Sequence, residues 1–114
     1  MSKRNPSLLL EDILQAVEKI DLYTEGMSQE AFMKDSRTID AVVRNLEIIG
    51  EAASRIPEEF RTRYPDIPWR RIVGLRNRIV HEYFGVDLDI VWSVLTVDLP
   101  PLGTQIKQIF DNLR

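Results

Sequence analysis

Hydrophobic residues recur along most of the chain every three or four positions, the spacing of helices that bury one face. In the first run these positions are Leu10, Ile13, Leu14, Val17 and Ile20. The run predicts a helix that is capped by Ser7 and ends near Tyr23.

A second, longer helix is predicted from Asp35 or Ser36 to about Ile56, where Pro57 stops it. Its main apolar stripe consists of Ile39, Val42, Val43, Leu46, Ile49, Ala53 and Ile56. A second set lies nearly opposite and consists of Ala41, Ile48 and Ala52. A helix with two apolar faces is packed on both sides, so we expect the second face to meet another subunit. Arg44, Glu47 and Glu51 lie between the two faces and predict an ion pair within the helix.

The third predicted helix begins at Pro68 and runs to about Tyr83 or Phe84. Gly85 follows it and can end it in a left-handed cap.

Asp87 can cap a last helix, which Pro100 and Pro101 must kink or restart because proline has no N–H to donate. Short helical turns are expected at residues 28–34, capped by Ser28, and at residues 58–63. No strand alternation or internal repeat interrupts this pattern. The sequence therefore predicts an all-α antiparallel bundle of four or five helices that forms one domain over residues 1–114.

Composition narrows the possible functions. The 114 residues are 44% hydrophobic and 29% charged, as in an ordinary globular domain, and include no cysteine. Disulfides, thiolate metal sites and cysteine nucleophiles are therefore excluded. The five glycines form no phosphate-binding loop, and His81 has no Asp or Glu four residues away, so we expect neither cofactor nor metal. The apolar runs are too short for a membrane span or a signal peptide, which predicts a cytoplasmic protein.

Basic charge is concentrated in one segment. The net charge of the chain is −3, but seven arginines and three acidic residues lie between Arg55 and Arg78, which gives that segment +4. This contrast favours a local anion site. The alternative is that these arginines form ion pairs with neighbouring acidic helices.

The third predicted helix carries the residues most suited to chemistry. On an ideal helix Arg76 projects from an apolar stripe, with Tyr83 about 20° away and two turns further on. Asn77 and His81 lie one above the other on the next sector. Arg76 and His81 do not point the same way, so they can converge only through the length of arginine, a local distortion or a second subunit.

These residue types suit metal-free cleavage of RNA. A histidine with a pKa near 6.5 can move a proton to or from the 2′-hydroxyl or the leaving oxygen, and an arginine can neutralise charge on the phosphorus. Asn77 can orient the phosphate or the imidazole, and Tyr83 supplies a phenol for hydrogen bonding, stacking or modification. By spacing alone, purely structural roles for each residue stay open.

The segment Arg76-Asn77-x3-His81-x-Tyr83 resembles the Arg-x4-His-x-Tyr signature of the HEPN superfamily. The surrounding sequence is similar to its HepT-like branch over nearly the whole chain. The segments that carry this similarity are Asn45-Leu-Glu-Ile-Ile-Gly-Glu-Ala-Ala, Pro68-Trp-Arg-Arg-Ile-Val-Gly-Leu-Arg-Asn, Val86-Asp-Leu-Asp-Ile-Val-Trp and Leu99-Pro.

The resemblance implies an α-helical homodimer that is the toxin of a toxin–antitoxin pair. It implies a metal-independent RNA endonuclease in which Arg76 and His81 are catalytic, Asn77 supports them, and the motifs of two subunits face each other in a cleft. The implied antitoxin is a minimal nucleotidyltransferase that transfers AMP from ATP to Tyr83, and the attached AMP would keep RNA out of the anion site.

Two other functions remain open at this point. The same residues fit a non-catalytic subunit that holds a nucleotide or substrate for a nucleotidyltransferase. A purely structural dimerisation domain is the third possibility, and an uncharged, closed region around Arg76 and His81 would indicate it.

Overall fold

The structure is a computed structural model that describes residues 5–81 and 85–113, and it is an all-α bundle, as predicted. The helices are α1 (Pro6–Thr24), α2 (Gln29–Met33), α3 (Ser36–Arg55), α4 (Glu58–Arg63), α5 (Trp69–Val73), α6 (Leu75–Ile79), α7 (Leu88–Ser93), the π-helix η1 (Val94–Asp98) and α8 (Leu99–Asn112). Two short strands, β1 (Val80–His81) and β2 (Gly85–Val86), complete the chain. Within the described ranges, no helix has the length and apolar character needed to cross a membrane.

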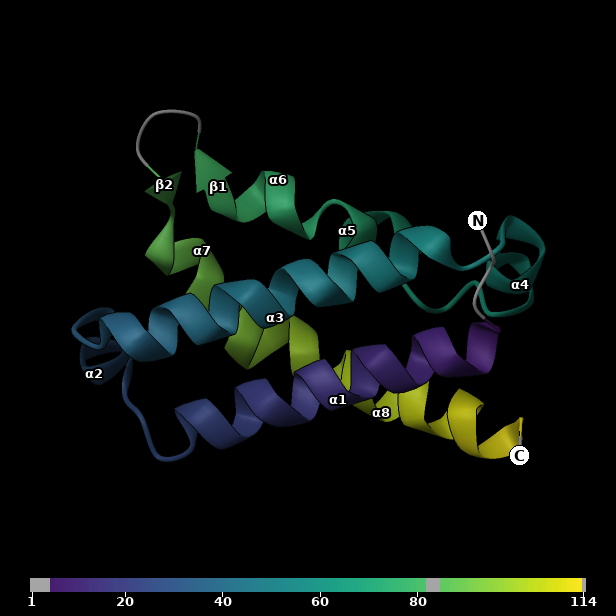
Figure 1. Ribbon diagram of the computed structural model, residues 1–114, viewed down its shortest axis with the longest axis horizontal. Coiled ribbons are helices and arrows are strands. Elements are labelled where there is room, and N and C mark those ends of the chain that lie inside the picture. The colour runs from purple at the N-terminus through teal and green to yellow at the C-terminus, as the bar shows by residue number, and fades with distance from the viewer. Residues whose placement is uncertain (1–4, 82–84, 114) are drawn as a thin grey trace.

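The core lies between α1, α3 and the C-terminal helices. Figure 1 shows α1 and α3 running side by side, with the rod of α7, η1 and α8 crossing behind them. The predicted stripes form this core: the side chains of Leu10 and Ile13 in α1 and of Val42, Leu46 and Ile49 in α3 are fully buried. Burial of these apolar faces is what drives the helices together.

The two prolines of the last helix are accommodated by a change of helical type. A π-helical segment, η1, precedes them, and α8 begins at Leu99, so that Pro100 and Pro101 occupy its first turn. The N–H groups of a first helical turn have no acceptor within that helix, so a proline, which lacks the N–H, costs little stability there. The sequence predicts a kink or restart at this point; the structure shows a change of helical type without a gap between η1 and α8, and the N–H of Leu99 donates to the Val94 carbonyl.

The third predicted helix is shorter than expected. Gly74 divides it into α5 and α6, and α6 ends at Ile79 instead of at Tyr83 or Phe84. The chain then pairs antiparallel with itself, with Val80 opposite Val86 and His81 opposite Gly85. The peptide N–H of Asp87 donates to the Ile79 carbonyl at 2.6 Å. This hydrogen bond and the strand pair satisfy backbone groups that a longer helix would have satisfied.

Gly85 has the positive φ expected of it, +73°, but it lies in β2 and not at a helix end. The predicted left-handed helix cap at this residue is therefore wrong. Glycine readily adopts a positive φ because it has no Cβ, and Gly85 adopts it where β2 pairs with β1.

Capping residues set the ends of several helices. Ser28 caps α2, Asp35 caps α3 and Asp87 caps α7, as predicted. The first helix begins two residues earlier than expected, because Asn5 and not Ser7 accepts the capping hydrogen bond. Asp35 accepts hydrogen bonds from the backbone N–H and the hydroxyl of Thr38, and these bonds lower its pKa.

α5 packs very closely against α3 at Gly50. A Cβ at this position would lie 3.3 Å from the Ile72 carbonyl oxygen and 3.6 Å from that of Val73. Gly50 therefore allows the backbones of α3 and α5 to approach each other, and this approach fixes where α6 begins.

Asp98 of η1 ties the C-terminal rod to α5 and α6. Its Oδ2 accepts a hydrogen bond from Nη1 of Arg78 at 3.0 Å and lies 3.5 Å from Nη2 of Arg71. The side chains of Asp98 and Arg78 are 23% and 30% exposed, so this pair is better shielded from water than the other ion pairs on the described surface.

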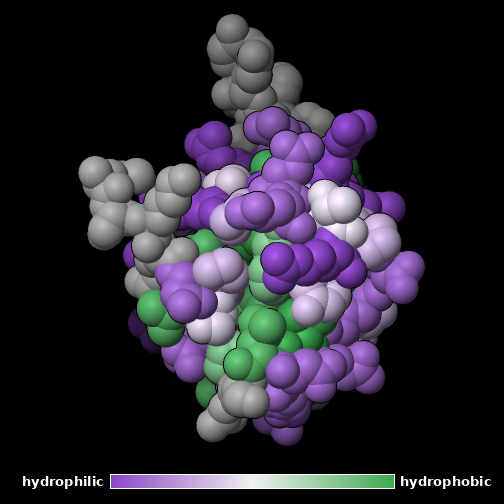
Figure 2. Space-filling model, turned by 90° about the vertical axis from the view of Figure 1, so that its right-hand side faces the viewer, coloured by the Kyte–Doolittle hydropathy of each residue, from purple (hydrophilic) through white to green (hydrophobic). Residues whose placement is uncertain are grey.

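The end of the molecule that carries both termini has a mixed surface. Figure 2 shows apolar side chains gathered in the lower half of this face and surrounded by hydrophilic ones. The exposed apolar side chains of the two terminal helical segments include Leu8 and Leu113, each 43% exposed.

We predict that Gly50→Val lowers the free energy of unfolding by about 1–3 kcal/mol, because added carbon atoms force α5 away from α3. Valine has a somewhat better helix propensity than glycine, so the loss reports packing and not propensity. Urea denaturation followed by circular dichroism measures it. Ser54→Val, at an exposed position of the same helix, is the control and should change stability little. Equal stability of Gly50→Val and the parent protein would contradict the close packing.

A second prediction concerns Asp98. Asp98→Asn should lower the free energy of unfolding by about 1 kcal/mol, since it removes the charge that holds Arg71 and Arg78 together. The loss should shrink at high salt, which screens the attraction. Asp111→Asn removes the more exposed pair with Lys107 and should cost less. If the two variants lose the same stability, Asp98 has no special part in joining these elements.

Candidate functional site

Arg76 lies on the first turn of α6, and its side chain is exposed. Leu75 and Ile79 of the same helix are buried, so α6 presents an apolar face to the core and Arg76 to the outside. Within the described ranges, Arg76 has neither an ion-pair nor a hydrogen-bond partner. The predicted guanidinium is thus solvent-accessible and has no ionic partner among the described residues.

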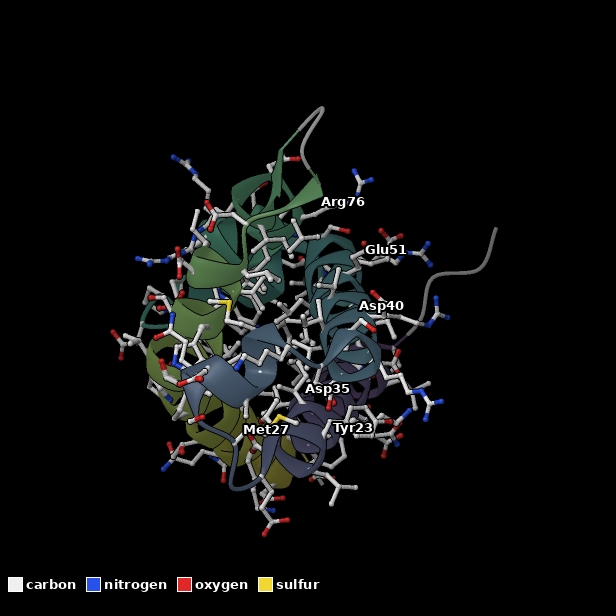
Figure 3. All side chains as sticks on the ribbon, turned by 90° about the vertical axis from the view of Figure 1, so that its left-hand side faces the viewer. Tyr23, Met27, Asp35, Asp40, Glu51 and Arg76 are labelled. Carbon is white, nitrogen blue, oxygen red and sulfur yellow. The ribbon has the colours of Figure 1, made fainter. Side chains whose placement is uncertain are left out.

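Arg76 borders an open groove of about 600 Å³ between α1, α3 and α6. Figure 3 shows Arg76 and Glu51 projecting from α6 and α3 on the same side of the molecule. The other residues of the groove come from α1 and α3: Leu9, Asp12, Arg44, Glu47, Ile48, Ala52 and Arg55. The second face of α3, with Ile48 and Ala52, therefore faces this groove. Packing of that face against another subunit remains a prediction.

Charges of both signs line the groove. Nη2 of Arg55 lies 2.8 Å from Oε1 of Glu51, in an ion pair four residues apart on α3. The ion pair predicted among Arg44, Glu47 and Glu51 does not occur within the described residues; Glu51 pairs instead with Arg55, which the prediction did not include. Both side chains are more than half exposed, so the pair contributes little to stability. A phosphate entering the groove would meet Arg76 as a cation that no carboxylate within the described residues already neutralises.

The seven arginines of the basic segment divide into two groups. Four have structural partners: Arg55 pairs with Glu51, Arg71 and Arg78 share Asp98, and Arg61 donates to three carbonyls at the end of α3. The exposed arginines without such a partner among the described residues are Arg63, Arg70 and Arg76. The alternative of ion pairs with neighbouring acidic helices is thus right for two of the seven, Arg71 and Arg78, which pair with Asp98 of η1.

The remaining predicted site residues follow Arg76 along the chain. Asn77 lies beside it on α6 and is exposed. The backbone of His81 lies in β1, paired with Gly85, so Asn77 and His81 do not stack on one helix as the wheel predicted. Tyr83 lies outside the described residues.

The sequence did not indicate which residues surround Arg76. Arg44, Glu47 and Glu51 stood out only as an internal cluster of α3, and Leu9 and Asp12 gave no signal at all. The second apolar face of α3 was the available clue, because it required a neighbour on that side. No group of three potential metal-ligating side chains occurs among the described residues.

Comparisons with known proteins identify the family of this chain. Residues 13–109 match the family described as Ribonuclease HepT-like. A candidate RNase of Caldanaerobacter subterraneus is 42% identical over 109 residues, which cover 96% of this chain and 97% of that protein. A protein of Thermococcus cleftensis named "Probable ribonuclease HepT" is 42% identical over 98% of each chain.

A candidate RNase of Methanocaldococcus jannaschii is 35% identical over 113 residues, which cover 99% of this chain and 93% of that protein. No solved structure matches the chain. Because the family match covers most of the sequence and the relatives align over nearly their full length, the chain belongs to the Ribonuclease HepT-like family.

Proposed function

We propose that this protein is a metal-independent RNA endonuclease with Arg76 and His81 as its catalytic residues. The observation that carries the proposal is an exposed Arg76, without an ion-pair partner in the described structure, at the edge of an open groove. Asn77 and His81 follow it along the chain at the spacing of the HEPN signature. The names of the relatives support RNA as the substrate.

The chemistry divides between these side chains. One imidazole takes the proton of the 2′-hydroxyl, or protonates the departing 5′-oxygen, as the hydroxyl attacks the adjacent phosphorus. Arg76 binds the phosphate oxygens and stabilises the negative charge that builds up on them in the transition state. Asn77 donates a hydrogen bond that orients the phosphate or the imidazole. A homodimer would bring two such sets together, and we propose it as the active form.

We predict that Arg76→Ala and His81→Ala each reduce the rate of RNA cleavage at least about 100-fold, the usual loss for a positioned acid–base or charge-stabilising group. Purified protein and labelled RNA in the presence of EDTA provide the measurement. An RNA with 2′-deoxyribose at the cleavage site should resist cleavage, because it lacks the attacking hydroxyl.

Arg70→Ala is the matched control, since Arg70 is also exposed and unpaired within the described ranges but does not line the groove. It should retain cleavage. Unchanged cleavage by His81→Ala would refute the proposed mechanism. Binding of ATP or AMP without RNA turnover would instead support a non-catalytic partner subunit.

We further propose that the protein is a toxin whose antitoxin, a minimal nucleotidyltransferase, transfers AMP from ATP to the Tyr83 hydroxyl and releases pyrophosphate. Tyr83 follows His81 by two residues in the sequence. An AMP group attached there carries its own phosphate, which Arg76 can bind in place of RNA. The modification would thus block the anion site with a covalently attached anion.

We predict that Tyr83→Phe prevents this modification. Intact-mass spectrometry of protein co-expressed with a nucleotidyltransferase encoded beside it should show added AMP on the parent protein and none on the variant. Tyr64→Phe is the control and should be modified like the parent. AMP on the Tyr83→Phe variant would show that another residue is the acceptor.

A further inference from the structure

A second cavity lies between α5 and α6 on one side and η1 and α8 on the other, and it shares no residue with the groove at Arg76. Its volume is about 180 Å³. An apolar cavity of about 150 Å³ in another protein is large enough to hold benzene. This cavity can therefore accept one aromatic ring or one branched alkyl side chain.

The walls and the rim of this cavity differ in character. Ile72, Leu75, Val94 and Leu102 line it and are buried, so its walls are apolar. Val97 also lines it but is 63% exposed, which extends the apolar surface outward. A ligand confined to the cavity would leave Val97 in water, whereas a polypeptide lying over the rim would cover it.

The rim carries a cationic group with spare donors. Arg71 and Arg78 share the single carboxylate of Asp98, so this trio has a net charge of +1. Arg71 is the more weakly held of the two: its Nη2 lies 3.5 Å from Asp98, and its side chain is 57% exposed. A guanidinium has five N–H donors, so Arg71 can bind an incoming carboxylate while Arg78 keeps its bond to Asp98.

We infer that this cavity is a docking site for a segment of a partner protein that presents one large apolar side chain beside an Asp or Glu. The apolar side chain fills the cavity, the neighbouring backbone covers Val97, and the carboxylate pairs with Arg71. Charge complementarity selects an acidic segment over a basic one. The inference does not depend on RNA cleavage, so its failure and that of the proposed nuclease are separate results.

Heteronuclear NMR of the full chain tests the inference with the peptide acetyl-Asp-Phe-Glu-amide as the probe. We expect saturable shifts of the backbone amides of Val94, Val97 and Leu102, with a dissociation constant on the order of 1 mM. Acetyl-Lys-Phe-Lys-amide and acetyl-Asp-Ala-Glu-amide should each bind at least about threefold more weakly, since one reverses the charge and the other leaves the cavity unfilled.

Matched variants distinguish binding at the cavity from nonspecific attraction of the acidic peptide to surface arginines. Arg71→Ala should weaken binding of the acidic peptide at least about threefold, while Arg70→Ala, one residue earlier and outside the cavity, should not. Val97→Asp should also weaken binding through repulsion of the peptide carboxylates. The dispersion of the NMR spectrum shows whether each variant is folded.

Four outcomes would overturn the inference. The first is the absence of saturable shifts at these amides, and the second is equal binding to Arg71→Ala and Arg70→Ala. The third is binding of 3-phenylpropionate as tightly as the peptide, which would indicate a small-molecule site. A change in molar mass on Val97→Asp, measured by light scattering, would show that a second copy of the chain covers this surface and would also refute the inference.

Discussion

The close approach of α3 and α5 at Gly50 is the constraint on which the candidate site depends. α6 follows α5 after one residue, Gly74, so whatever positions α5 against α3 also positions Arg76 over the groove. The indole N–H of Trp69 donates to the Tyr64 carbonyl at 3.0 Å and fixes the start of α5. With both ends of α5 held, the exposed guanidinium has a defined place beside α3, although it makes no ion pair of its own within the described structure.

The same packing explains why a basic segment is found in an acidic protein. Arg61 donates to carbonyl groups at the C-terminal end of α3, and Arg71 and Arg78 bind Asp98 across the bundle. These arginines act as structural connectors between elements. Their charge is therefore no measure of affinity for nucleic acid, and the acidic balance of the whole chain does not argue against a local anion site at Arg76.

The sequence predicted those features that depend on neighbours close in the chain. The apolar stripes of α1 and α3 and the caps at Asp35 and Asp87 follow from periodicity and local hydrogen bonding, and the structure confirms them. The end of α6 depends instead on the Asp87 N–H, which reaches the Ile79 carbonyl from eight residues away. The residues around Arg76 come from α1 and α3, distant in sequence, so no local pattern could indicate them. Residue type and helical spacing singled out the candidate site residues, and the resemblance to the HEPN signature is what favoured catalytic over structural roles for them.

Because α6 ends early, the Arg-x4-His spacing does not have the geometry of a continuous helix. On a continuous helix, residues five positions apart point about 140° away from each other, and Arg76 and His81 could then converge only with difficulty. The chain leaves the helix at Ile79, and the backbone of His81 belongs to a strand whose partner begins at Gly85. The helical angle therefore no longer separates the two residues. The Arg-x4-His spacing crosses from a helix into a strand pair, so the angle of an ideal helix does not apply to it, and convergence of the two side chains stays a prediction.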